Sequence, residues 1–168
     1  MASFWQNKAE KAGCNDRENA LNVIISRSSS ITANKTKMEQ ADALNSQNKL
    51  KKAYEMYKDV LHLNSGHSDA LFGIGVILEK QQKFDLAIQF LSKASESNPD
   101  KWQALLARGR IFRLKGIFEN AISDFTEVIA QHPDNFEALI ARGTTFGQTS
   151  QFNAAIDDFS LAIRSDPN

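Results

Sequence analysis

The chain has few of the residues that several protein classes require. It holds one cysteine, Cys14, in 168 residues, so it can form no intrachain disulfide and a reducing compartment is expected. No apolar run approaches the ~18 residues of a membrane-spanning helix, and the N-terminus lacks the apolar stretch of a secretory signal. These absences favour a cytoplasmic location, with the nucleus as the alternative.

Chemistry-bearing motifs are equally scarce. The three histidines (His62, His67 and His132) form no ligand set with one another or with Cys14, and no glycine-rich phosphate loop or nucleophile motif is present. The sequence therefore predicts no metal, no cofactor and no enzymatic activity. The net charge is zero, which gives no reason to expect a nucleic acid or a membrane as partner.

Proline is also rare, but its spacing is regular. Pro99, Pro133 and Pro167 stand 34 residues apart, and a fixed period of this length indicates a repeat architecture. Other columns keep the same period without insertion or deletion. They are a small column (Ala41, Gly75, Gly109, Gly143), an alanine column (Ala53, Ala87, Ala121, Ala155) and a large apolar column (Tyr57, Leu91, Phe125, Phe159).

Four units follow from these columns: 34–67, 68–101, 102–135 and 136–168. Each contains two apolar stretches at helical spacing, which predicts a helix–turn–helix. The small residues allow the two helices to approach closely, and proline ends the second helix. The predicted fold class is all-α.

These columns resemble the tetratricopeptide repeat, a helix–turn–helix unit of 34 residues, over residues 34–167. The first unit departs from the pattern, with Lys37 at a large apolar position and Ser65 in place of proline. The resemblance implies a right-handed superhelix of four stacked units, a solenoid whose concave groove is lined by the first helices and binds proteins.

Both ends of the array leave alternatives open. Residues 1–33 are one period long and are predicted to be largely helical, either as a degenerate capping unit or as an arm that packs elsewhere or swaps between chains; disorder is a third interpretation. At the other end no capping helix follows the fourth unit, so a longer array or a second copy is expected to cover its apolar face. That face would leave four residues partly open: Ile156, Phe159, Ala162 and Ile163.

The resemblance also places the groove residues. They form an apolar ladder with polar neighbours and a basic spot at Arg110 and Arg113: Met38, Asp42, Phe72, Val76, Leu106, Arg110, Arg113, Ile140 and Thr144. Such a groove suits an amphipathic helix or an extended peptide that carries an acidic group. In the alternative interpretation the ladder packs inside the array and the arginines pair with Glu79 or Glu137.

Members of the family that grip acidic chaperone tails use a clamp of lysines, asparagines and arginine. The matching positions here cannot hold two carboxylates, so a clamp-type binder is not expected: Met38, Asp42, Gly73, Gln103 and Ala107. Two further columns predict structure instead of binding. Arg108 and Arg142 are each followed sixteen residues later by an aspartate, Asp124 and Asp158, and we expect interhelical ion pairs.

The predicted function is a protein–protein interaction module that presents its groove to a segment of a partner protein. Two alternatives remain. The chain is a self-assembling scaffold subunit, a homo-oligomer joined through the N-terminal segment or the open C-terminal face, or it is the recognition part of a larger protein or enzyme.

Overall fold

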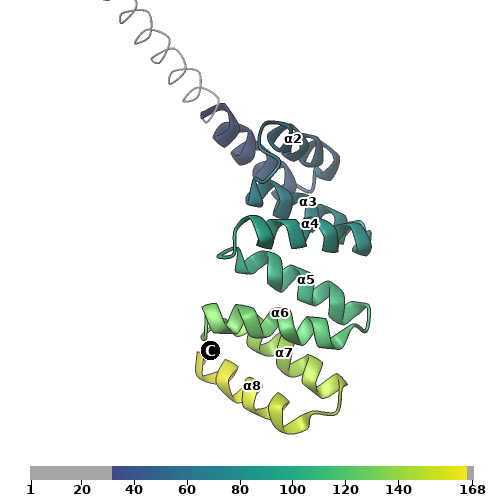
Figure 1. Ribbon diagram of the computed structural model, residues 1–168, viewed down its shortest axis with the longest axis vertical. Helices are drawn as coiled ribbons and strands as arrows, with labels where there is room; N and C mark the ends of the chain where they lie inside the picture. Colours follow the sequence, from purple (N-terminus) through teal and green to yellow (C-terminus); the bar gives the residue numbers. More distant parts are fainter. Residues whose placement is uncertain (1–31, 166–168) are drawn as a thin grey trace, which may run out of the picture.

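The computed structural model describes residues 32–165, in which every regular element is an α-helix (Figure 1). After a helical stretch over residues 32–46, seven helices follow: α2 Leu50–Leu63, α3 Ser68–Lys80, α4 Phe84–Ser97, α5 Trp102–Leu114, α6 Phe118–Gln131, α7 Phe136–Gln148 and α8 Phe152–Ser165. From α2 to α8 each helix packs against the next, and α3 also contacts α5 as α5 contacts α7. This is the predicted all-α solenoid, with four helix pairs in the described range.

The turn within each pair contains one residue with a left-handed backbone. These residues stand 34 apart, although only one of them is glycine: Asn48 (φ 57°), Gln82 (φ 59°), Gly116 (φ 74°) and Ser150 (φ 61°). At the second turn the N–H of Lys83 donates to the carbonyl of Leu78 over 2.9 Å, which closes the end of α3. The sequence pattern did not reveal this column because asparagine, glutamine and serine share no obvious preference.

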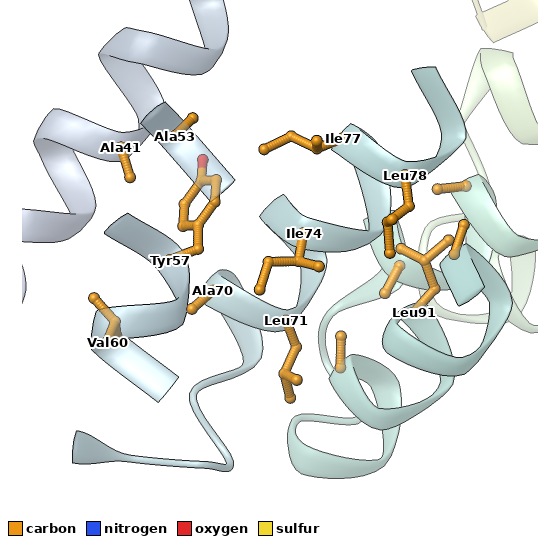
Figure 2. Packing of buried hydrophobic residues seen from close by; sticks show 14 of the residues in the cluster. Ala41, Ala53, Tyr57, Val60, Ala70, Leu71, Ile74, Ile77, Leu78 and Leu91 are labelled. Atoms are coloured by element: carbon orange, nitrogen blue, oxygen red, sulfur yellow. The ribbon is translucent and has the colours of Figure 1, made fainter. Parts of the chain in front are cut away.

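The core runs along the stack between the first and second helices. Figure 2 shows the ring of Tyr57 on α2 between Ala41 on one side and Ile74 and Ile77 on the other. All these side chains are fully buried. The predicted alanine column is buried as well, at 0–5 % exposure in each pair, so these positions are small because another helix lies against them.

Each large side chain of the second helices lies over a residue that must be small. A β-carbon added at Gly75, Gly109 or Gly143 would come within 2.6–2.8 Å of the large residue sixteen positions later, closer than real contacts allow. The first pair has Ala41 at this position. There the glycine is instead Gly73 on α3, where an added β-carbon would stand 2.4 Å from the Tyr57 ring.

Around three of the four large side chains the pattern amounts to one glycine and one alanine. Leu91 has Gly75 in its own pair and Ala107 in the next, and Phe125 has Gly109 and then Ala141; both alanines belong to the packed clusters around these side chains. Tyr57 reverses the order, with Ala41 and then Gly73. The two first helices on either side of such a large side chain therefore both carry a small residue, which lets them approach it closely.

The predictions for the two ends fare differently. Those for residues 1–33 fall, apart from the last two residues, outside the described range, as does Pro167. On α8, Ile156 and Ile163 are 61 % and 66 % exposed, as expected. Ala162 was predicted to be partly open, which is wrong: it is fully buried, because it faces the interior of its own pair.

Candidate functional site: the concave groove

Two arginine–aspartate pairs join the helices of the third and fourth pairs. Arg108 on α5 donates from Nε and Nη2 to the two carboxylate oxygens of Asp124 on α6, over 2.9 and 2.7 Å. Arg142 on α7 holds Asp158 on α8 in the same manner, over 2.8 and 2.7 Å. Both aspartates are buried, and the hydrogen bond to Asp124 raises the pKa of Arg108 above its ordinary value. The structure thus brings together both pairs that the sixteen-residue spacing predicts.

The same arginines also reach back to the preceding pair. Arg108 donates from Nη1 to the hydroxyl of Ser92 over 2.8 Å, and Arg142 donates to Thr126 over 3.1 Å. Each guanidinium therefore connects three helices from two successive pairs. The guanidinium N–H groups of both arginines thus have acceptors within the chain, so these side chains have a structural role.

A cleft of about 830 Å³ crosses the first helices of the first three pairs. Its apolar lining comes from Met38, Phe72 and Val76, and its polar lining from side chains on the same helices and the turns before them. The polar and charged lining residues are Asn34, Lys35, Glu39, Asp42, Asn45, Asn64, His67, Asp69, Lys101 and Arg110, with Tyr57 reaching in from α2.

The nine predicted groove residues divide between the two ends of this face. Five line the cleft: Met38, Asp42, Phe72, Val76 and Arg110. The other four do not: Leu106, Arg113, Ile140 and Thr144. Leu106 is buried in the core at 4 % exposure, while Ile140 is half-buried. The apolar ladder is therefore interrupted at α5, because Leu106 packs inside the array, as the alternative interpretation of the ladder expected.

The basic spot differs from the expectation as well. Arg110 pairs with Glu137 over 2.5 Å and lies 3.9 Å from Glu79, so its charge is balanced within the chain. The side chain of Arg113 has neither an ion pair nor a hydrogen bond within residues 32–165, and its buried Nε is unsatisfied. Of the two arginines, Arg113 is the one available to an acidic group.

Burial changes the acid–base behaviour of two groups at the groove. Burial raises the pKa of Glu79 above its ordinary value; Arg110 opposes this shift, while Glu137 adds to it. Burial likewise raises the pKa of Tyr57, whose hydroxyl donates to Asp42 over 2.6 Å. At neutral pH Tyr57 is therefore a neutral donor that orients a groove carboxylate.

Two contributors to the cleft, Lys101 and Tyr57, were missed by reasoning along columns of the first helices. Lys101 lies just before α5, where it pairs with Asp69 over 2.6 Å and holds its ammonium 5.2 Å from the centre of the Phe72 ring. Tyr57 enters from a second helix. A tyrosine in a column of leucine and phenylalanine was the available signal, because a buried phenol requires a polar partner.

Within the described range no cluster of histidine, cysteine, aspartate or glutamate is arranged to hold a metal ion. None of the helices there combines the length and the apolar content needed to cross a bilayer.

Comparisons with known proteins agree on the fold. The chain is similar to the crystal structure of MamA, with 18 % identity and a TM-score of 0.75, over 80 % of this chain and 78 % of that one. It is also similar to MamA 41-end from Desulfovibrio magneticus RS-1, with 17 % identity and a TM-score of 0.72, over 80 % and 76 % of the two chains. No curated protein matches by sequence.

Family models extend the agreement to the sequence. One tetratricopeptide repeat model matches residues 44–109, and a second matches residues 91–135 and 118–168. Together they cover all four predicted units except the start of the first. The chain belongs to the tetratricopeptide repeat family.

Proposed function

We propose that the chain is a protein-interaction module that binds an extended peptide or an amphipathic helix in its concave groove. The observation that carries this proposal is the cleft of about 830 Å³ with Met38, Phe72 and Val76 in its lining. An apolar floor with a polar rim is the usual composition of a recognition site, in which burial supplies affinity and the rim supplies orientation.

The charges refine the class of partner. The cleft rim carries the internally balanced pairs Lys101–Asp69 and Arg110–Glu137, which leave no strong net charge to attract a highly charged tail. Further along the face, Arg113 has no partner in the described chain. The best-fitting segment therefore places apolar side chains over Phe72 and Val76 and an acidic residue near Arg113.

The test is a selection of random peptides displayed on phage against the full chain, followed by affinity measurements on Val76→Asp. This substitution should not disturb the fold, because the equivalent positions of the other pairs hold Asp42, Arg110 and Thr144. Leu161→Asp, on α8 and outside the cleft, is the matched control. Selected peptides should bind Val76→Asp at least about tenfold more weakly and the control unchanged. Equal binding to both variants would reject the groove.

Self-association through α8 is a second candidate, supported by the exposure of three apolar side chains. Phe152, Ile156 and Ile163 are 61–66 % exposed, whereas their counterparts on α6 (Phe118, Ile122 and Ile129) are half-buried where α7 packs against α6. The mass in solution, measured by light scattering for the chain and for Ile156→Asp, tests it. A dimer that the substitution dissociates supports this candidate, and a monomer in both cases excludes it.

A further inference from the structure

The turns inside the helix pairs gather along one edge of the stack. Because successive helices reverse direction, these turns lie on one side and the turns between pairs lie on the other (Figure 1). Neighbouring turns are in contact: residues 48–52 share a depression with Gln81, Lys115 pairs with Asp85, and Gly116 shares a second depression with Thr149. We call the turns with their flanking residues (47–52, 80–86, 114–120 and 148–154) the lysine edge.

Charge is sorted between the two edges of the stack. The lysine edge holds six lysines and two carboxylates: Lys49, Lys51, Lys52, Lys80, Lys83 and Lys115, with Asp85 and Glu119. The turns between pairs (62–69, 96–101 and 130–137) hold one lysine and five carboxylates: Lys101, with Asp69, Glu96, Asp100, Asp134 and Glu137. The zero net charge of the chain thus conceals an edge with an excess of positive charge.

The lysines are accessible and few are neutralised. All six are exposed, and only Lys115 has a carboxylate partner among the described residues. Lys49 and Lys80 donate to amide oxygens, which leaves their charge in place. The ammonium groups of the remaining three, Lys51, Lys52 and Lys83, make no hydrogen bond or ion pair with any residue in the range 32–165.

Large apolar side chains stand among these lysines. Leu114 is 63 % exposed and Ile117 is 38 % exposed, on either side of Lys115 and Gly116. Leu86 and Phe152 are exposed on the neighbouring turns. Aliphatic side chains that project from turns between ammonium groups form an amphipathic surface without a groove.

We propose that the lysine edge docks on the surface of an anionic lipid bilayer. The ammonium groups would meet the headgroup charge, while Leu86, Leu114 and Ile117 enter the boundary between headgroups and acyl chains. A nucleic acid fits less well, because the edge has no arginine and the aliphatic side chains have no function against phosphate. A lipid surface also requires no shape complementarity from a row of separate turns.

This proposal revises the expectation that no membrane is a partner. That expectation followed from the zero net charge and from the lack of a long apolar run, whereas peripheral docking depends on how surface residues are distributed. No residue of the lysine edge lines the groove, so docking and peptide binding can be tested separately.

The test is co-sedimentation of the full chain with vesicles of phosphatidylcholine alone and with about 30 % phosphatidylserine. The edge variant is Lys51→Gln/Lys52→Gln/Lys83→Gln. The control is Lys58→Gln/Lys93→Gln/Arg164→Gln, which changes the net charge equally but lies on the second helices away from the edge. Circular dichroism checks that each variant folds.

The wild type should bind only the anionic vesicles. The edge variant should bind them more than about tenfold more weakly, and the control should remain close to wild type. A Leu114→Ser/Ile117→Ser variant should lose the part of the binding that resists salt. Failure to pellet with anionic vesicles, or equal losses in the edge variant and the control, would overturn the proposal. So would binding to duplex DNA that the leucine and isoleucine changes leave intact.

Discussion

Phe125 packs between one glycine, Gly109, and one alanine, Ala141. This arrangement can be tested by exchanging the two residues. In Gly109→Ala the new methyl group would lie 2.6 Å from Cε1 of Phe125, whose ring is fully buried and cannot move into solvent. Overpacking of this kind costs about 1–3 kcal/mol, while alanine gains about 1 kcal/mol over glycine in a helix. The net expectation is a loss of up to about 2 kcal/mol in the free energy of unfolding.

Gly147→Ala is the matched control. It lies in α7, and an added β-carbon there has no atom within 4 Å. The same exchange should therefore stabilise the chain, by up to about 1 kcal/mol, since only the helical preference changes. Urea unfolding followed by far-UV circular dichroism measures both variants, and unchanged slopes with shifted midpoints would identify a change in stability.

The decisive variant is the exchange Gly109→Ala/Ala141→Gly. It restores one glycine and one alanine around Phe125 and resembles the natural order around Tyr57. Ala141→Gly alone should cost about 1 kcal/mol, so additivity predicts a total loss of about 1–3 kcal/mol. If the ring can shift toward α7, the double variant should lose clearly less than this sum. Strict additivity, or a Gly109→Ala variant stabilised as much as Gly147→Ala, would refute the packing account.

Three further predictions concern charge and backbone conformation. Asp124→Ala should destabilise the chain by about 3 kcal/mol, because it leaves the guanidinium of Arg108 largely buried without its carboxylate; urea unfolding checks this, and a loss below that of an ordinary surface substitution would contradict it. The raised pKa of Tyr57 means that the folded chain keeps a phenol proton that the unfolded chain releases near pH 10, so the free energy of unfolding should fall as pH rises beyond 10.0. Tyr57→Phe should lack this alkaline loss, and equal slopes in both proteins would count against the assignment. Gln82→Gly should stabilise the chain by about 1 kcal/mol, because glycine adopts the left-handed backbone without strain. An unchanged urea-unfolding midpoint would show that Gln82 causes no backbone strain in this turn.

Much of the fold could be predicted because the repeat states each packing requirement several times. The small, alanine and large columns recur every 34 residues, so chance agreement at one position matters little. The arginine–aspartate pairs were predictable for the same reason: both partners occur in two units and are absent together from the others. Such signals describe contacts within one unit or between adjacent units.

The groove could be predicted only in part. Leu106 belongs to an apolar column like Phe72, yet one is buried and the other lines the cleft. Column membership specifies which helix face a residue occupies, but the depth of the groove depends on how far successive pairs rotate. The neutralisation of Arg110 likewise depends on Glu79 and Glu137, which lie on the helices either side of α5.

The sequence by itself determined the repeat, its helices and the contacts that hold each pair together, because these depend on residues at short, fixed separations. Only the tertiary structure decided which arginine remains free, which glycine accommodates Tyr57, and how charge is distributed over the surface. These properties arise from stacking, which brings together residues about one period apart and aligns every inner turn on a single edge. A chain with no net charge thereby acquires an edge with an excess of positive charge.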